Sequence, residues 1–143
     1  EKTFGLLNRK TYEAFAQRVS VIKEKVYNFV KKLNDEGKIV YAYGASTKGN
    51  TLLQYCNLDY TLIKKAVDRD PVKYGKKTIG TKIPIISEEQ GRKEIPDYFL
   101  ILRWHLAEYF KQREKNFLDS GGKFIVPLPE FKIIEKNSTW VNN

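Results

Sequence analysis

The strongest constraint on the fold is a series of short apolar runs that begins after Gly37. Each run ends in a polar or glycine-containing turn, and the four clearest are 38–44, 63–68, 98–102 and 123–127. Helical stretches separate them, around residues 49–56, 88–94 and 107–119. Near-continuous apolar strands that alternate with helices are typical of a parallel sheet covered on both faces. The sequence therefore predicts an α/β, Rossmann-like three-layer fold with a mostly parallel sheet. The run 83–86 is a candidate for a further short strand, in which Pro84 indicates either a sheet edge or the start of the strand.

A long amphipathic helix precedes these runs. From Tyr12 to Leu33 the apolar residues recur every three or four positions, and Gly37 suits a left-handed cap at the end of the helix. We expect the apolar stripe to pack on the domain's own sheet. Because the spacing is also heptad-like, docking on a neighbouring domain or a partner helix is the alternative. We divide the chain into a linker remnant (1–10), one Rossmann-like domain (11–135) and a flexible tail (136–143).

Composition excludes several classes of protein. A chain of 143 residues suits one domain. Its longest apolar run, 99–102, is far shorter than the roughly 20 residues of a membrane helix. One cysteine and one histidine argue against a disulfide scaffold and against a zinc site. We therefore expect a cytoplasmic protein with no metal and no membrane partner. The chain starts at Glu1 and has no methionine, so we also expect it to be part of a longer protein.

The net charge of +9 is concentrated in one segment. Residues 38–82 hold nine basic and three acidic side chains. Such a patch attracts a polyanion, which can be nucleic acid, an acidic membrane or the phosphates of a small ligand. Because the charge gathers around the turn 44–50 and the segment 73–82, we favour a phosphate-bearing small ligand over nucleic acid.

The turn after the first strand is the main candidate site, because open parallel sheets bind ligands beyond the carboxyl ends of their strands. Small residues there present backbone N–H groups and a helix N-terminus to an anion. The turn nearly matches the phosphate-binding loop of NTPases, but Asn50 replaces the lysine, and Ser46 replaces the second glycine of the dinucleotide fingerprint. The alternative is a turn whose small residues serve packing alone. The candidate ligand-binding residues are Gly44, Ser46, Thr47, Lys48, Gly49 and Asn50.

Four further candidates follow later strands. Asp68 stands where Rossmann folds place a ribose-binding acid, although capping of the turn at Pro71 is an equal alternative. Lys73 can reach a phosphate, and Trp104 can stack on a base or a sugar. His105, the one histidine, is the remaining candidate, but for this residue and for Cys56 we favour a structural role over catalysis. We assign no catalytic residue.

Four motifs in order carry a family resemblance: YGASTKGNTLLQYC (43–56), VDRDPVKYGK (67–76), GTKIPI (80–85) and GGKFIVPLP (121–129). From about Ile39 to Glu130 the chain resembles the C-terminal domain of S-adenosylmethionine-dependent C-methyltransferases that act on nucleotide-linked deoxysugars. Two segments depart from the family. Arg103-Trp104-His105 stands where the family usually has Pro-Trp-Asn, and Thr78-Ile79 where proline commonly precedes Gly-Thr.

The resemblance implies a division of labour. Complete members have a zinc-binding N-terminal part, a central domain that binds S-adenosylmethionine and carries the catalytic residues, and this C-terminal domain. We therefore expect residues 1–143 to need no cofactor and to transfer no methyl group alone. Their expected partners are a nucleotide-sugar and the preceding methyltransferase domain of the same chain. The alternatives are a free-standing nucleotide- or coenzyme-A-binding module and a basic nucleic-acid-binding domain.

Overall fold

Six strands form one sheet in the order β3-β2-β1-β4-β5-β6 within residues 8–138, which are the residues that the computed structural model describes. Strands β1 to β5 are parallel, and β6 runs antiparallel to β5. This arrangement confirms the α/β, Rossmann-like prediction. The strands are β1 (Val40–Tyr43), β2 (Lys65–Asp68), β3 (Ile85–Ser87), β4 (Tyr98–Ile101), β5 (Lys123–Val126) and β6 (Lys132–Ile134).

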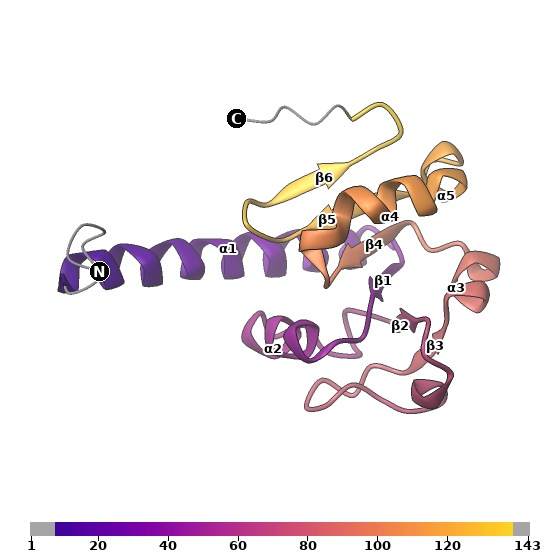
Figure 1. The fold of residues 1–143 in the computed structure, drawn as a ribbon, viewed down its shortest axis with the longest axis horizontal. Helices are drawn as coiled ribbons and strands as arrows, with labels where there is room; N and C mark the ends of the chain where they lie inside the picture. The colour runs from indigo at the N-terminus through magenta and orange to yellow at the C-terminus, as the bar shows by residue number, and fades with distance from the viewer. Residues whose placement is uncertain (1–7, 139–143) are drawn as a thin grey trace.

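Helices cover both faces of the sheet (Figure 1). The long helix α1 (Arg9–Asp35) and α2 (Thr47–Tyr55) pack on one face, and α3 (Glu88–Glu94), α4 (Ala107–Arg113) and α5 (Lys115–Asp119) pack on the other. Alternate residues of β1 point to opposite faces, as the pleat of a strand requires. Val40 and Ala42 join the core under α1 and α2, whereas Tyr41 and Tyr43 join the core under α3 to α5.

Two features of the sheet and its helices differ from the sequence prediction. Strand β6 was not predicted, because three residues are too few to show a period, and its pairing with β5 decides its conformation. The stretch expected as one helix over 107–119 is split at Glu114, whose backbone is not helical. Two 3-10 helices, η2 (Pro71–Lys73) and η3 (Trp104–Leu106), lie in the connections after β2 and β4.

Only the last part of α1 packs on the sheet. Val26, Val30 and Leu33 are buried, whereas Tyr12 and Phe15 are each 58% exposed. The expectation that the whole stripe packs on the sheet is therefore wrong for the first half of α1, which extends beyond the body of the molecule (Figure 1). A helix of 27 residues is about 40 Å long, and strands of four residues span only about 13 Å, so the sheet can cover only part of it.

The ends of the domain are defined by local contacts. Asn8 caps α1 by accepting a hydrogen bond from the N–H of Lys10, so Arg9 and Lys10 are helical although we placed them in the linker. Gly37 has φ of 74°, which confirms the left-handed cap. At the other end, the Lys111 ammonium donates to the carbonyl of Ser138. The linker residues 1–7 and the tail residues 139–143 lie outside the described part of the chain. None of the described helices is long and apolar enough to cross a membrane.

Candidate functional site

The chain leaves β1 at Gly44, next to the point where the order of the strands in the sheet reverses. From β1 the chain continues to β2 and β3 on one side, and β4 to β6 lie on the other, so the ends of β1 and β4 form the topological switch point. Gly44 has φ of 88°, a left-handed conformation that favours glycine. A Cβ there would also lie 3.1 Å from Cδ of Arg103. Gly44 therefore both makes the turn and leaves room for the Arg103 side chain.

The first turn of α2 is fixed against the end of β4. The Ser46 hydroxyl caps the helix by accepting a hydrogen bond from the N–H of Gly49, with N and Oγ 3.1 Å apart. A Cβ on Gly49 would lie 2.8 Å from Cβ of Leu102, so glycine allows the close approach. Thr47 and Lys48 are exposed, and the Lys48 ammonium has no ion-pair or hydrogen-bond partner within residues 8–138. Asn50 holds a buried side-chain oxygen that accepts no hydrogen bond from the described residues.

Asp68 is 9% exposed, and its carboxylate forms hydrogen bonds within its own loop. One oxygen accepts a hydrogen bond from the N–H of Asp70 at 2.9 Å, and the other lies 3.0 Å from Nζ of Lys73. Nζ of Lys73 also donates to the carbonyl of Ala45 at 2.8 Å, which ties η2 to the turn after β1. Asp70 caps η2 through the N–H of Val72. The turn-capping alternative is thus realised, and both Asp68 and Lys73 already have partners.

A cavity of about 300 Å³ opens at the carboxyl ends of β1, β2 and β4. It brings together Gly44 and Asp68, which the sequence singled out, with two residues that the sequence prediction missed, Arg69 and Arg103. Arg69 directly follows β2, and Arg103 lies two residues beyond the end of β4. This position after a strand was the signal available in the sequence. The other residues that line the cavity are Tyr43, Glu88, Leu106, Tyr109, Phe110 and Arg113.

Some of the charged side chains around the cavity form ion pairs and others do not. Glu88 pairs with Arg113, and its carboxylate also lies 3.2 Å from a guanidinium nitrogen of Arg92. In the described part of the chain, by contrast, the side chains of Arg69 and Arg103 have no ion pair and no hydrogen bond. Two uncompensated guanidinium groups therefore face this cavity.

A buried carboxylate holds the wall of the cavity in place. The Glu114 side chain is 2% exposed and accepts hydrogen bonds from the Tyr43 hydroxyl at 2.6 Å and from Nη2 of Arg92 at 2.5 Å. Burial alone would raise the pKa of Glu114, but the hydrogen bonds from Arg92 and Tyr43 outweigh it and hold the pKa below its usual value. Burial, followed by the bond to Glu114, raises the pKa of Tyr43. At neutral pH the tyrosine is therefore neutral and the carboxylate charged.

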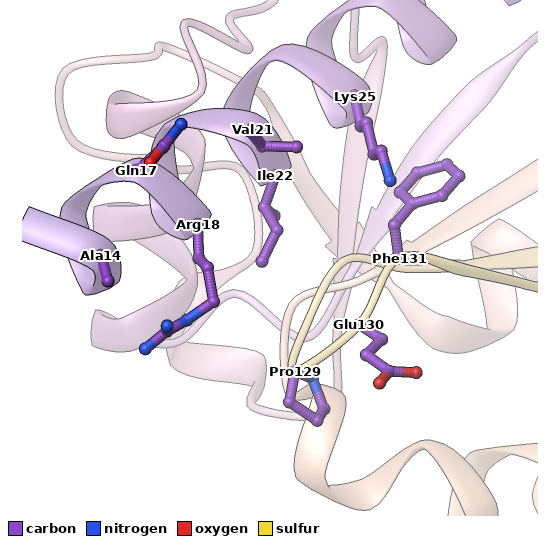
Figure 2. Close-up of a pocket in the computed structure, with 9 residues that line it drawn as sticks. All are labelled: Ala14, Gln17, Arg18, Val21, Ile22, Lys25, Pro129, Glu130 and Phe131. Carbon is purple, nitrogen blue, oxygen red and sulfur yellow. The ribbon is translucent and has the colours of Figure 1, made fainter. Parts of the chain in front are cut away.

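Two further hollows lie near the connection between β5 and β6. Trp104 and His105 line a cavity of about 500 Å³ with Leu128 and Glu130, apart from the cavity at Gly44. A groove of about 630 Å³ lies between α1 and this connection, and Figure 2 shows its lining residues. These are Ala14, Gln17, Arg18, Val21, Ile22, Lys25, Pro129, Glu130 and Phe131. The sequence-predicted residues thus occupy the α2 turn, the switch-point cavity and the cavity at the end of β5.

The described residues offer neither a metal site nor a reactive thiol. No group of three or more histidine, cysteine, aspartate or glutamate side chains in this part of the chain is placed to hold a metal ion. Cys56 is 1% exposed, and burial raises the pKa of its thiol to about 11. The thiol is therefore protonated at neutral pH and acts as a small packing residue.

Comparison with known proteins agrees with these features. A model of the C-methyltransferase C-terminal domain matches residues 1–129. The chain is also 40% identical over 139 residues to the C-methyltransferase NovU of Streptomyces niveus. That alignment covers 97% of this chain and 33% of NovU, so the chain spans one third of the length of this relative. This chain therefore belongs to the family of C-methyltransferase C-terminal domains.

Proposed function

We propose that residues 1–143 form the substrate-holding domain of an S-adenosylmethionine-dependent C-methyltransferase. In this proposal they bind a nucleotide-linked sugar, while a preceding domain of the same chain binds S-adenosylmethionine and transfers the methyl group. The observation that carries the proposal is the Lys48 ammonium, which has no partner among residues 8–138 and lies on the first turn of α2, at the switch point of a Rossmann-like sheet. A helix N-terminus with a free cation suits the diphosphate of a nucleotide-sugar.

The residues of the turn have distinct tasks in this proposal. Lys48 and the first N–H groups of α2 contact the phosphate oxygens, and the exposed Thr47 adds a hydroxyl donor. Ser46 and Gly49 keep the turn in shape through the cap and the contact with β4. Lys73 positions the turn by its bond to Ala45, because its ammonium already has two acceptors. Asn50 lies beside these residues in the first turns of α2, and we keep its side chain as a further candidate contact.

Two residues of η3, in the connection after β4, complete the proposed contacts. Trp104 and His105 line a cavity of about 500 Å³, which gives an aromatic surface on which a base or a sugar ring can stack. Neither residue is assigned a chemical step.

We assign no contact with S-adenosylmethionine to the described residues. Asp68, the acid that would bind ribose hydroxyls in a Rossmann-like site, already accepts hydrogen bonds from Asp70 and Lys73. Because the Asp68 carboxylate already has these two partners, we place the cofactor in the preceding domain. The exposed apolar residues in the first half of α1, Tyr12, Phe15 and Val21, are the surface that we assign to contact with that domain.

Isothermal titration calorimetry with nucleoside diphosphate sugars and with S-adenosylmethionine tests the proposal. We expect nucleotide-sugar binding, and we expect Lys48→Gln to weaken it about tenfold because one charge-assisted contact to phosphate is lost. Lys115→Gln is the matched control, since it removes the same charge from α5, and it should change the affinity less than about twofold. Binding of S-adenosylmethionine without binding of nucleotide-sugars would overturn the proposal, as would equal effects of the two variants.

A further inference from the structure

The cavity at the switch point carries an inference that goes beyond the α2 turn. We propose that it binds an oxyanion of the substrate, a phosphate or a carboxylate, between the guanidinium groups of Arg69 and Arg103. The proposal rests on the proposed function, because it assigns a second part of the same substrate to a second set of residues. It makes these two arginines determinants of which substrate the domain accepts.

Charge balance is the first argument. Five charged side chains line the cavity, and three of them are already paired: Asp68 with Lys73, and Glu88 with Arg113. The Asp68 carboxylate also accepts the N–H of Asp70, so both its oxygens are used within the loop. Neither arginine of the proposed site has a partner among residues 8–138. The uncompensated charge at the cavity is therefore positive. It belongs to guanidinium groups, which bind carboxylates and phosphates through two parallel hydrogen bonds.

The placement of the two arginines is the second argument. Arg69 follows β2 and Arg103 follows the end of β4, and β1 lies between these strands in the sheet. The two side chains therefore approach the end of β1 from opposite sides. Gly44 makes this possible, because the Cγ and Cδ atoms of Arg103 lie 3.2 and 3.1 Å from the place where a Cβ on Gly44 would stand.

The walls of the cavity are the third argument. Tyr43, Leu106 and Phe110 line it with apolar surface, and the bond to Glu114 fixes the Tyr43 ring. Apolar walls reduce the local dielectric and strengthen attraction between a guanidinium group and an anion. Tyr109 adds a hydroxyl that accepts a hydrogen bond from a guanidinium nitrogen of Arg113 at 3.4 Å. This hydroxyl donates no hydrogen bond within residues 8–138, so its proton can point at a ligand.

The size of the cavity limits what it can hold. A volume of about 300 Å³ lies at the small end of ligand pockets. It suits one charged group with the ring that carries it, and it is too small for a complete nucleoside diphosphate sugar. The rest of the substrate therefore extends out of the cavity along the carboxyl edge of the sheet.

Calorimetry with four simple probes tests the inference: pyrophosphate, uridine diphosphate, galacturonate and uncharged galactose. We expect wild type to bind at least one anionic probe and to bind galactose at least tenfold more weakly. If pyrophosphate or uridine diphosphate binds, the oxyanion is a phosphate of the substrate. If galacturonate binds instead, the oxyanion is a carboxylate. Arg69→Gln and Arg103→Gln should each weaken the anion that binds by about tenfold or more.

Three controls make the result decisive. Arg103→Lys keeps the charge but cannot form the bidentate hydrogen bonds of a guanidinium group. The affinity of this variant should therefore fall between those of wild type and Arg103→Gln. Arg9→Gln removes the same charge from α1, where Arg9 pairs with Glu13, and should leave binding unchanged. Thermal unfolding followed by circular dichroism verifies that each variant is folded.

The inference and the proposed function fail in different ways. If nucleotide-sugars bind in a manner that depends on Lys48 but not on Arg69 or Arg103, the cavity is not an oxyanion site and the proposed function stands. If both arginine variants weaken oxyanion binding while no nucleotide-sugar binds at all, the cavity is confirmed and the proposed substrate is wrong. Wild type that binds none of the three anions overturns the inference.

Discussion

Single residues at the end of β1 meet two demands at once. Gly49 lies inside α2, where alanine would be the better helix former by roughly 1 kcal/mol. The close approach of α2 to β4 excludes that side chain, because a Cβ would lie 2.8 and 2.9 Å from two atoms of Leu102. Packing against the strand therefore outweighs helix propensity at this position.

Gly49→Ala should lower the free energy of unfolding by about 1–3 kcal/mol, because the added methyl group overpacks the contact with Leu102. Urea denaturation measures this change. Thr51→Ala in the same helix is exposed and should shift the stability by no more than about 0.5 kcal/mol. A variant at position 49 as stable as wild type would mean that the helix moves away from β4 at little cost.

The sequence indicated the glycines of the turn better than it indicated the charges. Gly37 was predicted because a left-handed cap needs a residue that tolerates positive φ, and Gly44 was predicted as part of the small-residue turn after the first strand. Ser46 was predicted as a ligand donor, and the structure uses its hydroxyl as a helix cap. The sequence prediction missed Arg69 and Arg103. Whether a cationic side chain is paired depends on tertiary contacts, and no local sequence pattern shows these.

At the scale of elements, α1 is two segments with different surroundings. Val30 is fully buried against the sheet, whereas Val21, nine positions earlier, is 45% exposed beside the groove of Figure 2. Asn34 fastens the buried end by donating hydrogen bonds from its side-chain amide to the carbonyls of Val30 and Leu62. The fold of this domain therefore depends on the last third of the helix.

The two valines give a matched test of this division. Val30→Ala should cost about 1–3 kcal/mol of unfolding free energy, since it removes buried methyl groups and leaves a cavity. The same substitution at Val21 should change the stability by less than about 0.5 kcal/mol, because little buried surface is lost. Both values come from chemical denaturation. Equal costs would show that the first half of α1 packs on the domain after all.

Sequence patterns predicted the elements that repeat and missed those that depend on one contact. The five parallel strands follow from apolar runs between helices. The run that contains Pro84 forms β3, which lies at an edge of the sheet, where proline is tolerated. The break between α4 and α5 was missed because it is tied to the buried bonds of Glu114 with Tyr43 and Arg92. No local pattern contains those distant partners.

At the scale of the whole molecule, ionised side chains join the helices to the sheet. Glu94 on α3 accepts hydrogen bonds from the Tyr41 hydroxyl on β1 and from Nζ of Lys65 on β2 at 2.7 Å. Hydrogen bonds from Gln90, Lys65 and Tyr41 lower the pKa of Glu94 from its ordinary 4.5 to about 2. The carboxylate thus links two strands and a helix for as long as it is charged.

Acid should weaken this link in a defined window. Because the pKa of Glu94 is lower in the folded state, its stabilising contribution is complete above pH 4.5 and is lost as the pH falls towards 2. We expect Glu94→Gln to cost on the order of 1–2 kcal/mol of unfolding free energy at pH 7 and almost nothing at pH 2. Denaturation at several pH values measures the difference. Glu108→Gln, at an exposed position on α4, should show no such dependence.

The anchoring of α1 at one end has a mechanical consequence. Arg9 lies 17 residues before Val26, the first fully buried position, and the helical rise of about 1.5 Å per residue makes this arm about 25 Å long. A rotation of about 10° at the sheet would carry the tip by about 4 Å along an arc. The arm therefore acts as a lever, which converts a small tilt of the buried end of α1 into a displacement as large as an atom's diameter at its far end.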